Sequence, residues 1–205
     1  MQEKPLLNPS YGLFLIRNKS AFNLETIIKL HGWASGLKAY FSLEKLFKGS
    51  QSASVIFAPL SVVDFLPELQ LLQLETYLPG VENTYVWSIA PNKTPKKITV
   101  DETFLQEISL TDEQQFFWQV VCFPQKGSSF NVTVRAMVKD NEQVKRIGLA
   151  KTIDRHILDC TGLIKQRDET NTELYNAFEN RSLIKKEALN FLLTAREILN
   201  IASLV

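Results

Sequence analysis

Two apolar runs separated by a short polar loop constrain the fold of this chain more than any other feature of its sequence. The runs cover residues 115–123 and 130–139, and the loop covers 124–129. The second run alternates apolar and polar residues, which is the period of a strand with one buried face. The first run is apolar on both faces, so both should be covered. The stretch therefore predicts a central β-hairpin whose first strand is covered by the core on one side and by a helix or a partner on the other.

The alternation of the second run also places its arginine. Arg135 lies near the middle of this run and shares its polar face with Lys139. Arginine and lysine side chains are mostly exposed in folded proteins. We therefore interpret Arg135 and Lys139 as surface or interface residues rather than as catalytic ones.

The rest of the chain mixes short apolar runs with stretches of helical spacing. Strands are predicted at 11–17, 53–59 and 84–91, and helices at 20–47, 60–69, 101–108, 140–163, 172–180 and 183–193. The strand, helix and strand within 11–59 predict a βαβ unit with a right-handed crossover. Together these elements predict an α+β fold, a two-layer sandwich with a mostly antiparallel sheet in an elaborated ferredoxin-like arrangement, followed by C-terminal helices.

Local signals mark several helix ends. Asp140 with Gln143, and Thr194 with Glu197, have the spacing of capping boxes. Gly162 is a plausible helix stop. The sequence GWASG at 32–36 has the spacing of two small residues that allow close packing, so we expect this part of the helix to pack against the sheet or a neighbouring helix. A polar stretch at 164–171 is the predicted linker.

These signals divide the chain into an N-terminal tail at 1–10, an α+β domain at 11–165 and a C-terminal helical extension at 166–205. The formal net charge is +1, so no overall field attracts the chain to nucleic acid or anionic lipid. There is no secretory signal and no apolar run long enough to span a bilayer, which predicts a soluble, cytoplasmic protein, with a membrane-peripheral location left open. Cys122 and Cys160 are predicted to be buried thiols in a reducing compartment.

Motifs for enzymatic chemistry are absent from the sequence. There is no GxxxxGK[ST], no GxGxxG and no GxSxG, and the two histidines lack metal-site spacing. We therefore predict a non-enzymatic protein with no cofactor and no metal. His31 falls on an apolar helical stripe and is interpreted as a core or boundary residue. One enzymatic alternative stays open, because Cys160 follows His156 by four residues and the two could meet on one helix face.

Binding to single-stranded RNA or DNA is a second alternative. Lys93, Lys96 and Lys97 form a basic loop, and Arg135 adds positive charge on the hairpin. Lysines and arginines beside aromatic residues can hold phosphates and stack bases. Acidic residues are interleaved with them, however, so a solvated face is the favoured interpretation.

The C-terminal stretch LNFLLTAREILNIASLV has no polar tail. Because chain ends fray unless they dock, this favours packing on the core, contact with a partner, or a coding region that once continued. A protein partner or self-association is therefore expected. The candidate interaction surface comprises Arg135, Lys139, Leu199, Ile201, Leu204 and Val205.

Several stretches resemble a known family. FWQVV, FNVTVRAMVKD, VKR and LAK, within 115–160, and FLLTAREILNIASL, within 191–204, are similar to the N-terminal α/β domain of conjugative type IV secretion ATPases. The chain stops where the Walker motifs of that family would begin, so no catalytic residue carries over. The resemblance implies a stand-alone assembly domain that binds secretion-channel proteins near the cytoplasmic face of a membrane. The expected function is thus that of an assembly subunit, with a secretion or DNA-transfer apparatus as the candidate assembly.

Overall fold

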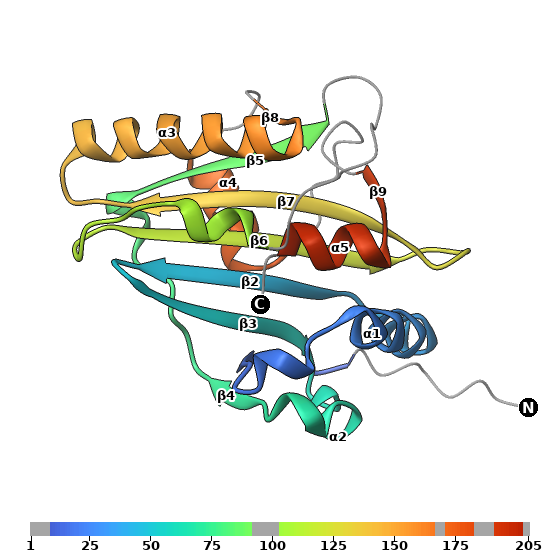
Figure 1. Cartoon of the computed structure of the whole chain (residues 1–205). Coiled ribbons are helices and arrows are strands. Elements are labelled where there is room, and N and C mark those ends of the chain that lie inside the picture. Colours follow the sequence, from blue (N-terminus) through green and yellow to red (C-terminus); the bar gives the residue numbers. More distant parts are fainter. Residues whose placement is uncertain (1–8, 92–102, 167–170, 183–190, 203–205) are drawn as a thin grey trace, which may run out of the picture.

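All the strands of the described chain belong to one antiparallel sheet (Figure 1). The structure, a computed structural model, describes residues 9–91, 103–166, 171–182 and 191–202. Within them the strand order is β4-β1-β3-β2-β6-β7-β5-β8, and β9 pairs with β7. The strands are β1 (Tyr11–Leu15), β2 (Phe41–Lys48), β3 (Gln51–Pro59), β4 (Leu72–Leu74), β5 (Thr84–Pro91), β6 (Gln115–Pro124), β7 (Ser129–Lys139), β8 (Leu163–Lys165) and β9 (Phe191–Thr194).

Helices cover both faces of this sheet, unequally. The helices are α1 (Leu24–Leu37), α2 (Val62–Phe65), α3 (Gln143–Thr161), α4 (Asn171–Glu179) and α5 (Ala195–Ala202). Helices α1, α3 and α5 pack on the face that carries the main core, whereas α4 lies on the opposite face over a smaller cluster (Figure 1). The predicted α+β sandwich with an antiparallel sheet is confirmed.

The predicted central hairpin is confirmed as β6 and β7. The two strands pair from Gln115↔Lys139 to Pro124↔Phe130, and the turn is shorter than the predicted loop. Both faces of β6 are covered, as its sequence predicts. Trp118 belongs to the main core, while Phe117 packs in the cluster beneath α4. The second face is thus covered by a helix of the same chain.

The predicted helix at 20–47 is wrong in its second half. Helix α1 begins after Asn23, whose side chain accepts a hydrogen bond of 3.2 Å from the N–H of Thr26. It ends at Lys38, whose φ of 52° is left-handed. Residues 41–48 then form β2. Consequently β1 and β3 are antiparallel neighbours and the predicted βαβ crossover does not form, because β2 returns the chain before β3 begins.

The C-terminal segment is part of the same fold rather than a helical extension. Residues 191–193, predicted as helix, form β9 together with Thr194 and pair with β7, whereas 183–190 lie outside the described residues. Helix α5 begins at the predicted capping box, because the N–H of Thr194 donates to Glu197 at 2.9 Å and the N–H of Glu197 donates back at 3.3 Å. Ile198 and Ile201 of α5 are fully buried in the main core.

Helix α3 agrees with the prediction at one end and departs from it at the other. It ends at Gly162, whose φ is 70°. At its start, Asp140 accepts a hydrogen bond from the N–H of Glu142 rather than forming the predicted pair with Gln143. The predicted linker at 164–171 overlaps β8 and the first residue of α4. Among the described segments, no helix has the length and apolar character needed to cross a membrane.

Candidate functional site

A row of buried polar side chains crosses the sheet on the α4 side. Glu44 of β2, Gln119 of β6 and Arg135 of β7 are register neighbours, and each is at most 2% exposed. Arg135 donates to Gln119 at 2.8 Å and to the carbonyl oxygen of Ala177 at 3.0 Å. Gln119 donates to Glu44 at 3.2 Å and to the carbonyl oxygen of Phe178 at 2.9 Å. The row therefore binds the carboxyl end of α4, where carbonyl groups lack helical partners.

Arg181 completes this row from the residues that follow α4. Its Nε donates to Glu44 at 3.0 Å in a buried ion pair, and its guanidinium lies 5.1 Å from the ring centroid of Phe57. The backbone of Arg181 is left-handed, with φ at 49°. The hydrogen bonds of this row join side chains to one another and to the end of α4. We therefore interpret the row as the structural attachment of α4.

Three predicted interaction residues are not surface residues of the folded chain. Arg135 is 0% exposed because α4 covers it, and this corrects its interpretation as a surface residue. Leu199 is 5% and Ile201 0% exposed because α5 packs into the core. Lys139 is half-buried at the end of β7. The other two candidates, Leu204 and Val205, lie outside the described residues.

The structure brings His156 and Cys160 together, as their spacing suggested. The sulfur of Cys160 lies 3.8 Å from Nδ1 of His156, and Nε2 of that histidine donates to the carbonyl oxygen of Phe104 at 2.7 Å. Burial, followed by the charges of Glu107 and Asp159, raises the pKa of the Cys160 thiol. A nucleophilic cysteine needs the opposite shift. Both cysteines are free, and burial also raises the pKa of Cys122.

Lys45 is a buried cation that sequence reasoning missed. It lies on β2 among inward-facing residues, is 2% exposed, and has its Nζ 5.9 Å from the ring centroid of Phe47. Burial, followed by the charge of Lys19, lowers its pKa to about 8. Among the described residues, no three His, Cys, Asp or Glu side chains are grouped so that they could hold a metal ion.

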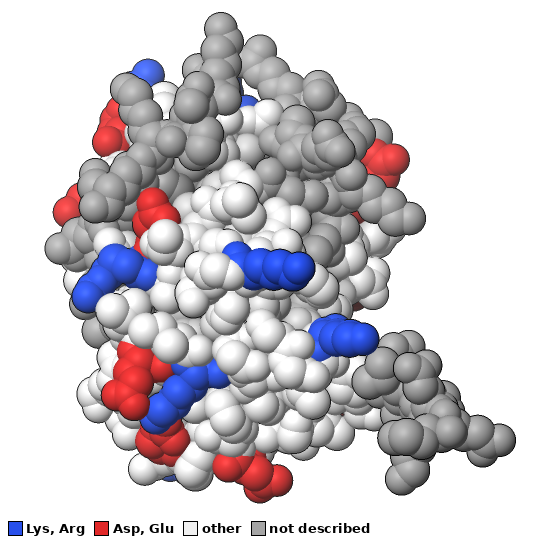
Figure 2. Space-filling model, turned by 90° about the vertical axis from the view of Figure 1, so that its right-hand side faces the viewer, with Lys and Arg blue, Asp and Glu red and all other residues white. Residues whose placement is uncertain are grey.

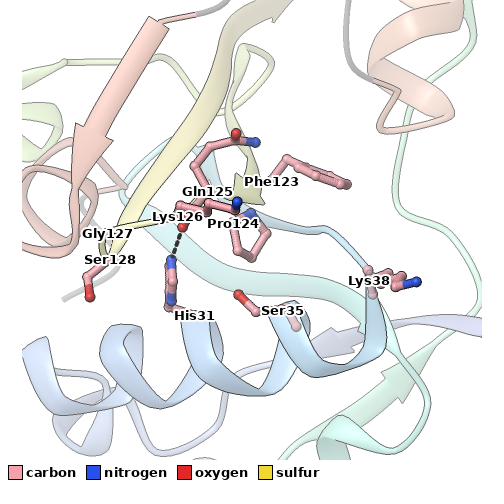
Figure 3. Close-up of a pocket in the computed structure, with 11 residues that line it drawn as sticks. His31, Ser35, Lys38, Phe123, Pro124, Gln125, Lys126, Gly127 and Ser128 are labelled. Atoms are coloured by element: carbon pink, nitrogen blue, oxygen red, sulfur yellow. Dashed lines mark hydrogen bonds between the residues drawn. The ribbon is translucent and has the colours of Figure 1, made fainter.

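His31 attaches the β6–β7 turn to α1. Its Nε2 lies 3.0 Å from the carbonyl oxygen of Gln125 and 3.1 Å from that of Ser129, so it donates to the turn (Figure 3). Its ring meets the edge of Phe130 at 4.9 Å between centroids. The predicted boundary histidine is confirmed. Because it connects two distant elements, His31 fixes the position of the turn over α1.

A pocket of about 590 Å³ lies between α1 and this turn, and we call it the turn pocket. Lys38 lies at one end of it and Ser128 at the other, with Ser35 and Pro124 between (Figure 3). The residues that line the turn pocket are His31, Ala34, Ser35, Lys38, Ala39, Phe123, Pro124, Gln125, Lys126, Gly127 and Ser128. No lining residue is acidic.

Exposed apolar side chains also concentrate on α1 and α2, and α1 lies between α2 and the β6–β7 turn (Figure 1). Five of the ten large apolar side chains exposed in the described part of the chain lie on α1, on α2 or at the turn before α2. The two helices are in contact, because the rings of Trp33 and Phe65 stack with centroids 5.4 Å apart. We define the α1–α2 face as Ile28, Gly32, Gly36, Leu37, Leu60, Val63 and Phe65.

The two glycines of this face correct the interpretation of GWASG. A Cβ added at Gly32 or Gly36 would meet no atom within 4 Å, so neither glycine packs against the sheet or a helix. They leave a shallow strip on the outer surface of α1. Seen from this side of the molecule, charged side chains are separated by wide uncharged surface (Figure 2). Sequence reasoning missed the face because an amphipathic helix is expected to bury its apolar residues.

Compared with protein-family models and with curated proteins, the sequence matches none of them.

Proposed function

We propose that this protein is a non-enzymatic assembly subunit that binds another protein through the α1–α2 face. The observation that carries this proposal is the clustering of exposed apolar side chains on two adjoining helices. Ile28 is 53% exposed, Val63 39% and Phe65 38%. Isolated apolar residues are normal on a protein surface, but a cluster with a polar rim is typical of an interaction site.

The shape and rim of the face support the same conclusion. Gly32 and Gly36 let the backbone of a partner approach α1 closely, and the stacked Trp33 and Phe65 supply aromatic surface of the kind that dominates binding energy. Lys29, which precedes Gly32 and Trp33 by one helical turn, forms ion pairs with Glu25 at 3.2 Å and with Glu68 at 3.5 Å. A partner would therefore meet apolar surface together with these ion pairs.

The alternative of nucleic-acid binding has less support. Lys93, Lys96 and Lys97 lie outside the described residues, and Arg135 is buried beneath α4. An apolar face with few charges suits a protein partner better than a phosphate backbone, which needs lysines and arginines. That the partner belongs to a secretion or DNA-transfer apparatus remains a proposal, which rests on the sequence resemblance alone.

Site-specific photo-crosslinking in the cells that make the protein tests the proposed face. We would place benzoylphenylalanine at Phe65, where it preserves an aromatic ring beside Trp33. The matched control is the same group at Val144 of α3, which is 84% exposed. We expect a discrete protein adduct from Phe65 and none from Val144. If neither position gives an adduct, or both give the same ones, the α1–α2 face is not the binding surface.

A further inference from the structure

We propose that the turn pocket binds an acidic, apolar segment of the partner protein, with its carboxylates at the two lysines and its apolar side chains on the pocket floor. This inference rests on the proposed function and names the chemistry of the partner. The carboxylates would belong to aspartate or glutamate side chains.

The floor of the pocket is suited to apolar side chains. Ala34 and Ala39 are at most 2% exposed, and Pro124 and Phe123 form the opposite wall. Small side chains on α1 leave the space that the larger residues of the turn do not fill. A volume of about 590 Å³ lies within the range of ligand pockets and exceeds what a lone carboxylate needs.

The rim of the pocket is cationic. Lys38 and Lys126 are exposed, and neither lies within 4 Å of a carboxylate in the described part of the chain. The exposed lysines of α1 and α3 at positions 29 and 145 instead form ion pairs with glutamates. Because no acidic residue lines the pocket, its positive charge remains available to an incoming carboxylate.

The end of α1 does not cancel this charge. A helix carboxyl end carries partial negative charge on unpaired carbonyl groups. Here the N–H groups of Lys38 and Ala39 donate back to the carbonyl oxygens of Ser35 and Ala34, at 3.2 and 2.9 Å. The hydroxyl groups of Ser35 and Ser128 add neutral hydrogen-bonding groups to the lining.

The pocket is held in shape and adjoins the α1–α2 face. The hydrogen bonds of His31 to Gln125 and Ser129 keep the turn over α1, so little ordering is needed on binding. Ser35 in the pocket and Gly36 on the face are successive residues of one helix. One partner segment can therefore reach both surfaces.

Nuclear magnetic resonance titration of the full chain tests the pocket directly. The probe is a blocked six-residue peptide of alternating glutamate and leucine, and its control has glutamine in place of glutamate. We expect saturable shifts of the backbone amide signals of Ser35, Lys38, Lys126 and Gly127 with the glutamate peptide, and much smaller ones with the glutamine peptide. Equal shifts with both peptides, or none with either, would overturn the proposal.

Charge-reversed variants test whether Lys38 and Lys126 bind the carboxylates of the peptide. Lys38→Glu and Lys126→Glu should each weaken peptide binding by about fivefold, the upper range for an exposed ion pair. Lys38→Arg should retain binding, and Lys151→Glu on α3 should not change it. Unchanged affinity in both reversed variants contradicts the assignment. Binding of octanoate without binding of the peptide would show a site for small amphiphiles instead.

The result of the peptide experiments can be distinguished from the result of the crosslinking that tests the proposed function. Crosslinking from Phe65 reports on the apolar face, and it would persist if the pocket played no part. Loss of the Phe65 adduct with retained peptide binding would support binding at the turn pocket and contradict partner binding at the α1–α2 face.

Discussion

At the scale of single residues, the two kinds of charged pair in this protein have very different surroundings. Arg181 and Glu44 meet with side chains only 11% and 2% exposed. Lys145 and Glu142 meet at 2.6 Å, but their side chains are 57% and 64% exposed. Water screens the second pair, whereas removing one partner of the first leaves a charge buried without compensation. The buried pair should therefore dominate the electrostatic contribution to stability.

We expect Glu44→Gln to lower the free energy of unfolding by about 3 kcal/mol, because it leaves Arg181 buried without its carboxylate. Urea denaturation followed by circular dichroism measures this. The matched control, Glu142→Gln, removes an exposed carboxylate and should leave the midpoint unchanged. Equal effects of the two substitutions would contradict the structural role of the buried row.

The buried position of Lys45 predicts how the stability of the fold depends on pH. Its pKa is lowered to about 8 in the folded chain, against 10.5 for the ordinary group, so the unfolded chain binds more protons between these values. Stability should therefore rise with pH across this window, by about 2 kcal/mol between about pH 7 and about pH 9.5. Urea titrations at several pH values measure the slope. Lys45→Met should abolish it, and an unchanged slope in that variant would assign it to other groups.

At the scale of elements, sequence patterns predicted the helices and strands whose signals are local. The strand at 84–91 and the capping box of Thr194 and Glu197 were both predicted as the structure has them. Strand β2 was not, because the apolar residues Leu37 and Phe41 continue the helical spacing of α1. The inward position of Lys45 also breaks the strand alternation that Phe41 begins. A buried lysine is an exception that pattern reasoning treats as an outward-facing residue.

The outer surface of α1 gives a prediction about helix stability. Gly32→Ala and Gly36→Ala should each stabilise the fold by about 0.5–1 kcal/mol, because a methyl group there meets open space and alanine favours helix. Gly12→Ala is the contrasting variant, since its Cβ would lie 2.7 Å from the buried ring of Phe14. It should destabilise the fold. Melting temperatures of the three variants test this, and destabilisation by both α1 alanines would show that these glycines have a structural role.

At the scale of the whole molecule, the sequence predicted the fold class but not how the C-terminal helices and strand pack on the sheet. Residues 166–205 were predicted as an extension, whereas β9 joins the sheet and α4 and α5 cover opposite faces. The polar face of β7 was predicted correctly, but Arg135 is buried because a helix more than 30 residues away covers it. Such contacts depend on tertiary packing that local periodicity does not encode. For the same reason local periodicity does not predict the α1–α2 face, which depends on the stacking of Trp33 and Phe65.

The most direct test of the central claim combines this face with its glycines. We would compare crosslinking from benzoylphenylalanine at Phe65 in the otherwise unchanged chain, in Gly32→Ala and in Gly32→Trp. Both substitutions project into open space, so both variants should fold, which thermal melting checks. We expect the adduct to persist with alanine and to disappear with tryptophan, whose ring blocks the approach to α1. An adduct that survives Gly32→Trp in a folded chain would contradict binding at the α1–α2 face.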